Sequence, residues 1–573
     1  MAPKYPGSSS TRRFRSLAAL FSLLVVSAML LAACGGTANN SSGSQSQTKH
    51  VLTLVDAPKG DFTSLFNPFT DPQTSRYGSQ GFLYETMVYY NRIDGSVKPW
   101  LASSYKQAPD LTSITFSIRP GVRWSDGQGT LTSDDVVFTL NLMKQYPALD
   151  IKGIWKTLIK SVSATDPNTV EVQLQHPDST ALWYIGGQTF IVPKHAWQGV
   201  SDPVKYTNDK PVVTGPFTLK SFSSQIFVYQ KNPNYWQPGL PKVDEIRLPA
   251  LNSNTSANLL LARGDLDWAG VGYDPKLDSI FVNKDPQHNH HWFPPSNVVT
   301  LYPNLKKYPF NVTAVRQAMS LAIDRQELQD KANPYAPPAS LTALVLPQSQ
   351  DFLDPAYANL QHTTVDAAKA DSLLKGAGFT KGSDGIYADK NGKKLSFNLN
   401  VVNGWSDWQS DCALIAKDLK AIGMDVHVNA LGDFAPYFAA MQKGDFDVTI
   451  SWTNPGPTPY YLYHDMLSSA QTAPIGQAAS TNFERWQDSK TDQLLQQYTS
   501  SPDPAAQKQA IAGLEKVMVE QLPTIPLTYN PFWNEYRTSR FVGWPDQTNP
   551  FAVPSPTNYP DNEYIILHLK PAA

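Results

Sequence analysis

A short basic and apolar segment at the N-terminus limits which residues can build the fold and where that fold forms. Three arginines between positions 12 and 15 precede an uncharged run of 17 residues from Leu17 to Ala33. Such a run is short for a helix that must cross about 30 Å of hydrocarbon. It ends in small residues, as a secretory signal peptide does. We therefore expect residues 1–33 to be removed and the rest of the chain to fold outside the cytoplasm.

The residue after this run is Cys34, and the surrounding sequence, LAACG, resembles the lipobox of bacterial lipoproteins. By that resemblance Cys34 becomes the first residue of the mature chain and carries the acyl chains that anchor it to the membrane. Several acyl chains on one residue give a stable anchor, whereas one chain is marginal. Residues 34–49 are rich in Gly, Ser, Asn and Gln, which predicts a flexible tether. The alternative is an ordinary signal peptide with an incidental cysteine.

Composition places the remaining chain among globular proteins. Of the 573 residues, 41% are hydrophobic and only 17% are charged, against roughly 25% in typical soluble domains. The 46 prolines indicate many fixed turns and argue against a helical bundle. Without residues 1–33 the chain has 43 basic and 49 acidic residues, so its net charge is −6 and we expect no nucleic-acid partner. The second cysteine, Cys412, shares a predicted helical face with Trp408 and Ile415, which indicates a buried thiol.

Hydrophobic periodicity predicts alternating strands and helices. Residues 115–119, 169–174 and 424–428 alternate as strands do, and residues 132–143 begin with the capping-box pattern of a helix. We expect Asn311 to cap a helix with an apolar stripe over residues 315–323. Two further helices are expected, one from Asp366 to Gly378 and one over residues 407–422. By pattern alone the fold class is mixed α/β with more than one domain.

Ten segments in order along the chain resemble the family 5 solute-binding proteins, the extracellular receptors of ABC importers for peptides, nickel and some oligosaccharides. Each segment alone is a weak signal, but their order is strong. The segments are Trp100–Ser104, Phe116–Gly127 (FSIRPGVRWSDG), Leu131–Val136 (LTSDDV), Val192–His195, Thr214–Phe217 (TGPF), Asn232–Trp236 (NPNYW), Gly264–Asp267 (GDLD), Asn304–Ala318, Gly444–Asp447 (GDFD) and Pro523–Leu527.

The resemblance implies a two-lobed α/β fold of the periplasmic-binding-protein type II class, with an extra inserted subdomain (cluster C-like). Two crossing segments, near 297–304 and 523–529, would join the lobes, which close on a ligand. A membrane permease is the implied partner, and we expect a monomer without a cofactor. The implied domains are residues 50–83 and 206–300 for the first lobe, 84–205 for the inserted subdomain, 301–522 for the second lobe and 523–573 for the return to the first lobe.

The ligand class stays open between an oligopeptide and an oligosaccharide. Peptide-binding members commonly hold the ligand's amino group with an Asp shortly after a tryptophan that follows the GDFD motif. Here Trp452 is present, that carboxylate is absent, and Asp465 is the nearest later acid. Aromatic rings flanked by polar groups suit a sugar, and the GWSDW segment resembles the cello-oligosaccharide-binding branch of the family. The candidate ligand-binding residues are Trp405, Trp408, Trp452, Asn454, Tyr460 and Tyr461.

Two other function classes, a metal-binding receptor and a secreted hydrolase, are not favoured by the sequence. His288, His290 and His291 are clustered, and nickel-binding relatives exist, but no Cys or Glu stands at ligand spacing, so we expect no metal site. A secreted glycan hydrolase would need paired acids in a tryptophan-lined cleft. The chain lacks the Gly-x-Ser-x-Gly and His-Glu-x-x-His motifs, and helix capping accounts for Asp134 and Asp135. We therefore expect no catalytic residues.

Overall fold

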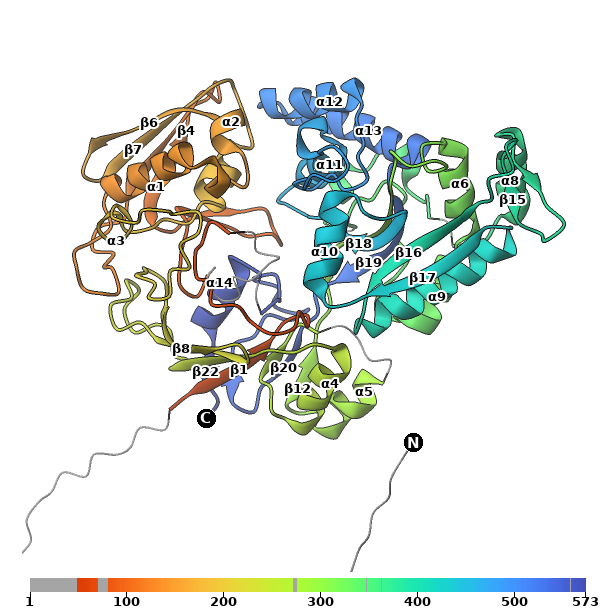
Figure 1. Cartoon of the computed structure of the whole chain (residues 1–573). Coiled ribbons are helices and arrows are strands. Elements are labelled where there is room, and N and C mark those ends of the chain that lie inside the picture. The colour runs from red at the N-terminus through yellow and green to blue at the C-terminus, as the bar shows by residue number, and fades with distance from the viewer. Residues whose placement is uncertain (1–48, 71–80, 272–275, 347, 362, 557) are drawn as a thin grey trace, which may run out of the picture. The chain divides into compact units, whose positions relative to one another are not determined.

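The computed structural model describes residues 49–70, 81–271, 276–346, 348–361, 363–556 and 558–573, and residues 49–573 form one compact unit (Figure 1). The predicted signal peptide, Cys34 and nearly all of the tether lie outside the described residues. Among the helices of the described part, none combines the length and the hydropathy that crossing a bilayer requires.

A seven-stranded mixed sheet forms the centre of what we call the first lobe, in the order β12-β20-β11-β1-β10-β9-β8. Strand β1 runs parallel to both β10 and β11, while β9 and β20 run antiparallel to their neighbours. Leu52 and Leu54 alternate toward the core, as expected for a strand with one buried face. The strand bounds are β1 Val51–Val55, β8 Phe217–Ser223, β9 Ile226–Lys231, β10 Glu245–Pro249, β11 Trp268–Ala269, β12 Asn289–His291 and β20 Glu535–Arg537.

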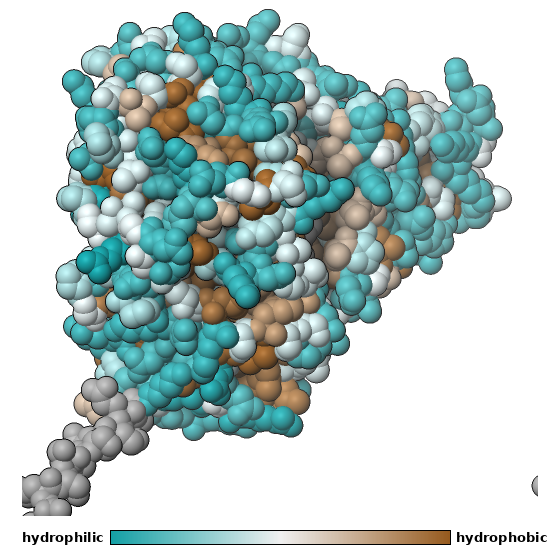
Figure 2. All heavy atoms as spheres, turned by 60° about the vertical axis from the view of Figure 1, so that its left-hand side comes forward, coloured by the Kyte–Doolittle hydropathy of each residue, from teal (hydrophilic) through white to brown (hydrophobic). Residues whose placement is uncertain are grey.

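The region between β1 and β8 carries a separate antiparallel sheet in the order β4-β5-β7-β6. Helix α1 packs on β6 and β7, and Thr132 and Asp135 form the predicted capping box at its start. The bounds are β2 Val88–Tyr90, β3 Val97–Pro99, β4 Ala102–Gln107, β5 Ser113–Ile118, β6 Ile159–Asp166, β7 Thr169–Leu174, α1 Ser133–Gln145, α2 Ile154–Thr157, the π-helix η2 Leu182–Gly187 and α3 Lys194–Trp197. In Figure 2, which turns this side forward, hydrophobic residues appear as separate patches among hydrophilic ones.

A five-stranded sheet in the order β17-β16-β18-β13-β19 forms the centre of the second lobe. Helix α9 packs against β16 and β17 (Figure 1). The strand bounds are β13 Pro295–Pro303, β16 Ser396–Val402, β17 Asp425–Leu431, β18 Val448–Trp452 and β19 Ile525–Pro531. The helix bounds are α6 Thr313–Ala322, α7 Arg325–Glu327, α8 Ala367–Gly376, α9 Ser406–Ala421, α10 Phe434–Lys443, α11 Pro459–Leu467, α12 Ser489–Ser500 and α13 Pro504–Gln521.

Three predictions made from the sequence concern two helix caps and one buried thiol. Asp366 caps α8 by accepting a hydrogen bond from the backbone N–H of Lys369, as expected. The thiol of Cys412 is fully buried. The prediction for Asn311 is wrong, because α6 begins at Thr313 and Val312 occupies the cap position without a side-chain bond.

The chain passes between the two large sheets twice, at residues 292–294 between β12 and β13 and at residues 532–534 between β19 and β20. Strands β13 and β19 pair with each other along most of their length. After β20 the chain completes the first lobe with β21 (Phe541–Val542), α14 (Asp561–His568) and β22 (Lys570–Pro571). The helices α4 (Asn254–Arg263) and α5 (Leu277–Ile280) come earlier in the chain, between β10 and β12. The assignment of residues 50–83, 84–205, 206–300, 301–522 and 523–573 to the lobes and the inserted subdomain stays a prediction.

Candidate ligand-binding site

A cavity of about 680 Å³ lies between the two lobes. That volume falls within the range of pockets that bury small organic ligands. The first lobe contributes residues around 56–59, 183–188, 254 and 555–559, and the second lobe contributes residues around 405–408, 438–442, 451–455 and 461–465. The crossing segment 532–534 also lines it, through Phe532 and Trp533, and Asn297 lines it from the start of β13. A molecule in this cavity would therefore contact both lobes and one of the segments that connect them.

Stacked aromatic rings form the wall that the second lobe gives to this cavity. The ring of Trp452 lies 5.7 Å from that of Trp405 and 5.9 Å from that of Phe434, with interplanar angles of 20° and 10°. Trp408 packs edge-on against Trp405 at 5.0 Å. We call Trp405, Trp408, Phe434 and Trp452 the aromatic wall. Its three tryptophans line the cavity, but Trp405 and Trp408 are almost completely buried, so Trp452 is the one that offers a partly exposed apolar face to a ligand.

The local backbone explains why these rings meet. Trp452 is the last residue of the central strand β18, and Trp405 and Trp408 stand at the start of α9, which follows the neighbouring strand β16. Because β16 and β18 are parallel, their carboxyl ends lie at the same edge of the sheet. Gly404 turns the chain there with a φ of 88°, and a Cβ at that position would lie 2.8 Å from the backbone oxygen of Asn252.

The inserted region supplies a second set of rings. Trp183 and Tyr184, in the π-helix η2, line the cavity and face α11 of the second lobe. The ring of Tyr461 lies 5.5 Å from Trp183 and 5.6 Å from Tyr184. Sequence reasoning missed these two residues. The one signal for them was an aromatic pair beside two glycines in a helix, and π-helices occur frequently at functional sites.

The structure brings five of the six predicted ligand-binding residues together. Trp405, Trp408, Trp452, Asn454 and Tyr461 line the cavity, whereas Tyr460 lies outside its lining. The Tyr460 ring stacks instead on Tyr498 at 4.8 Å and on His464 at 5.5 Å. Tyr460 and Tyr461 are adjacent in α11, and consecutive helical residues point in different directions. Tyr460 therefore packs edge-on against Tyr461, at 5.3 Å, from outside the cavity.

Charged groups of both signs also line the cavity, and most of them escaped sequence reasoning. Arg92 has Nε 3.5 Å from Oδ2 of Asp561 and its guanidinium over the ring of Phe532. Burial, offset in part by the Arg92 charge, raises the pKa of Asp561 to about 6. Asp465 lies beside His464, with 3.4 Å between Oδ1 and Nδ1. The charged residues of the lining are Asp56, Lys59, Arg92, Lys152, Asp407 and Asp465, which gives three of each sign.

Direct contacts join the lobes next to the aromatic wall. Nε1 of Trp405 donates to the backbone oxygen of Pro58 at 3.0 Å, and Nδ2 of Asn254 donates to Oδ1 of Asp407 at 3.1 Å. On the other side of the cavity the N–H of Ser179 donates to the oxygen of Thr499 at 2.8 Å. The described structure is therefore one in which the lobes touch on both sides of the cavity.

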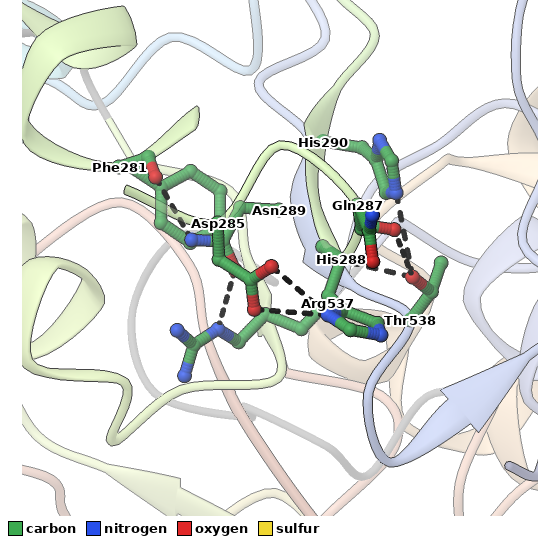
Figure 3. A network of polar contacts seen from close by, with 8 residues as sticks. All are labelled: Phe281, Asp285, Gln287, His288, Asn289, His290, Arg537 and Thr538. Atoms are coloured by element: carbon green, nitrogen blue, oxygen red, sulfur yellow. Dashed lines mark hydrogen bonds and ion pairs between the residues drawn. The ribbon is translucent and has the colours of Figure 1, made fainter. Parts of the chain in front are cut away.

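His288 and His290 belong to one network of polar contacts in the first lobe, in which both contact Thr538 (Figure 3), and the cavity lining includes none of the three clustered histidines. Nδ1 of His288 lies 2.9 Å from Oδ1 of Asp285, and Nε2 of His290 lies 3.3 Å from Oγ1 of Thr538. His291 stacks on a phenylalanine ring and contacts Asp278. Among the described residues, no group of three His, Cys, Asp or Glu side chains could hold a metal ion.

Comparisons with known proteins agree on one family. Residues 96–474 match the family model described as "Bacterial extracellular solute-binding proteins, family 5 Middle". The chain is 24% identical over 482 residues to the peptide transport periplasmic protein SapA of Salmonella typhimurium, covering 79% of this chain and 82% of that one. It is 26% identical over 475 residues to the oligopeptide-binding protein AppA of Bacillus subtilis, covering 79% and 84%.

Solved structures show the same fold. The periplasmic oligopeptide-binding protein of an oligopeptide ABC transporter from Thermotoga maritima, with mannohexaose bound, superposes with a TM-score of 0.83. It is 26% identical, and the match covers 91% of this chain and 99% of that one. The predicted two-lobed α/β architecture with an inserted region is confirmed.

Proposed function

The chain belongs to the bacterial extracellular solute-binding proteins of family 5, and from this premise we propose that it captures a neutral oligosaccharide in the cavity between its lobes. Members of this family are non-enzymatic binding proteins of ABC transporters. Beyond this family role, we propose the class of the ligand, the residues that contact it, and its delivery to a membrane permease.

The aromatic wall carries the proposal for a sugar. Pyranose rings have apolar faces and a rim of hydroxyl groups, so they pack on flat aromatic faces while amides bind their edges. The wall presents the tryptophans at 405, 408 and 452 to the cavity, with Tyr461 and the rings of η2 on the other side. Side-chain amides that can bind hydroxyls line the same space: Gln188, Asn254, Asn297, Gln442, Asn454, Gln471, Asn530 and Asn558. The mannohexaose bound by the Thermotoga maritima relative supports this reading.

An oligopeptide is the second candidate, favoured by one observation. Asp465 and Arg92 both line the cavity, and a carboxylate and a guanidinium can hold the two charged ends of a peptide. Asp465 already contacts His464, and Arg92 already pairs with Asp561. A peptide would have to compete with these contacts, whereas a neutral sugar leaves them in place.

We propose that lobe closure accompanies capture. The paired strands β13 and β19 lead directly into the two crossings, so small backbone changes at residues 292–294 and 532–534 would move one lobe relative to the other. A ligand that contacts both lobes only when they are closed shifts the equilibrium toward the closed form. The permease would then recognise the closed form of a monomer.

A ligand panel tests the ligand class. Cello-, xylo- and manno-oligosaccharides of two to six units should raise the melting temperature, because a ligand that binds only the folded form stabilises it. At 100 times the dissociation constant the gain is about 2.7 kcal/mol. Differential scanning fluorimetry measures the shift. A clear shift with di- to pentapeptides and none with any sugar would replace the sugar by the peptide.

We propose that Cys34 anchors the mature protein to the outer face of the cytoplasmic membrane. In cells, the wild-type protein should sediment with membranes and partition into the detergent phase of a Triton X-114 extraction. Cys34→Ala should move the protein into the aqueous phase, because a processed chain without acyl groups has nothing to hold it. A Cys412→Ala variant is the matched control and should stay with the membranes. Membrane partitioning of Cys34→Ala would contradict the proposal.

A further inference from the structure

Asp407 occupies an unusual position in the cavity. It is the second residue of α9, its side chain lines the cavity, and only 7% of the residue is exposed. Its Oδ1 accepts a hydrogen bond from Nδ2 of Asn254, which belongs to the first lobe. Asn254 is itself buried at this contact. The carboxyl of Asp407 is thus covered from one side by its own helix and from the other by the opposite lobe.

Among the described residues, no Lys, Arg or His side chain forms an ion pair with this carboxyl or with that of Asp411, one turn further along α9. Asp411 is also buried, and its Oδ1 has no hydrogen-bond partner among the described residues. Isolated carboxylates are costly to bury, because a medium of low polarity replaces their hydration. Two of them on neighbouring turns of one helix add mutual repulsion to that cost.

The elements packed around Asp407 bring few titratable groups toward it. Asn254 of α4 and Trp452 of β18 are neutral, α10 contributes the phenol of Tyr437, and α9 itself contributes Asp411 and Cys412. From the loop after β1, Lys59 lies over the ring of Phe434. The other charged or titratable groups of the cavity are Asp56, Arg92, Lys152, His464 and Asp465.

We infer that Asp407 is a ligand-binding residue that takes up one proton from the solvent when the lobes close, so that capture of a neutral sugar is linked to proton binding. This inference rests on the proposed function. A carboxylic acid both donates and accepts, as a sugar hydroxyl does, so the neutral form fits the ligand without leaving a buried charge. The only bond formed is the O–H bond of the acid.

The direction of the pH dependence follows from burial. Burial raises the pKa of Asp407 to about 6 in the structure with touching lobes, while hydrogen bonds from the backbone and from Asn254 oppose that rise. An exposed aspartic acid titrates near pH 4. The closed form therefore holds the proton more tightly than an open form in which the side chain meets water. Between about pH 4 and 6, sugar affinity should fall with rising pH, by up to about tenfold per unit, and it should level off above that range.

Isothermal titration calorimetry of the full mature chain with mannohexaose and with cellotetraose tests this at pH 5. Titrations in acetate and in a second buffer with a larger ionisation enthalpy give the number of protons taken up per sugar. We expect a value close to one for the wild-type protein and close to zero for Asp407→Asn. Asp445→Asn, which changes an exposed acid of the same lobe, should behave as the wild type.

The outcomes separate this inference from the proposed function. Binding of either sugar with equal heats in both buffers would overturn the proton linkage and leave the sugar-binding function standing. Uptake that persists in Asp407→Asn would also overturn it and would direct attention to His464. Absence of binding by both sugars would overturn both proposals together. Should Asp407→Asn fail to fold, a wild-type dissociation constant that does not change between pH 4 and 6 would be the contradicting result.

Discussion

Replacing Trp452 by alanine should weaken oligosaccharide binding by about 10- to 100-fold. The Trp452 ring is the central member of the aromatic wall, since it contacts Trp405, Trp408 and Phe434. Loss of one large apolar contact with the ligand costs about 1.5–3 kcal/mol, and each 1.4 kcal/mol is a factor of ten in affinity. Calorimetry with the sugar that gives the largest thermal shift measures the change.

Two further substitutions test whether the loss of affinity depends on the face of the Trp452 ring that lines the cavity. Trp452→Phe keeps an aromatic face toward the cavity and should recover most of the affinity. Tyr460→Phe changes a neighbouring ring that lies outside the cavity lining, so its affinity should equal that of the wild type. Unchanged affinity in Trp452→Ala, with a folded protein by circular dichroism, would remove the aromatic wall from the binding site and with it the main support for a sugar ligand.

The three tryptophans of the aromatic wall were named from short local segments of the sequence, whereas its fourth member, Phe434, was not. Trp452 ends β18 and the GWSDW segment follows β16, and these two parallel neighbouring strands bring their carboxyl ends together. The rings of the inserted region could not be found in this way. Trp183 and Tyr184 reach the cavity only because β2 packs against the π-helix η2 and places it opposite α11, which is a long-range arrangement without a local pattern.

The charge state of the buried carboxyl groups was harder to predict from the sequence than the position of the second-lobe tryptophans. Burial decides how a carboxyl behaves, and Asp407 was recognisable in the sequence only as a polar residue beside two tryptophans. Its contact with Asn254 joins residues 153 positions apart. The same holds for Arg92 with Asp561, where the partner comes from the last helix of the chain. The capping prediction succeeded at Thr132 and Asp366, where the donor and acceptor are three residues apart, and failed at Asn311, where the preceding turn changes the helix start.

A second buried pair of acids should contribute stability to the fold that is present in acid and is lost as the pH rises. Glu85 and Glu563 are almost completely buried, and the hydroxyl of Tyr235 lies 3.5 Å from Oε1 of Glu85 and 3.4 Å from Oε1 of Glu563. The indole N–H groups of Trp100 and Trp236 both donate to Oε1 of Glu85 at 2.9 Å. Burial raises the pKa of Glu85 and of Glu563, and the negative charge of Glu85 raises that of Glu563 further. The pair ties the inserted region to α14 of the first lobe.

Because the native state holds these protons more tightly than the unfolded chain, their stabilisation is complete below about pH 4 and is lost as pH rises. Each proton that unfolding releases contributes a slope of about 1.4 kcal/mol per pH unit. Glu563→Gln replaces the neutral acid by a neutral amide of the same shape, so we expect its unfolding free energy to fall less steeply between pH 5 and 9. At pH 9 the variant should be more stable than the wild type, as measured by urea unfolding followed by tryptophan fluorescence.

Glu520→Gln, at an exposed position of α13, should leave the wild-type slope unchanged. Equal slopes in the wild type and Glu563→Gln would mean that the pair is ionised in the native state, and that Trp100, Trp236 and the nearby Arg119 compensate its charge fully.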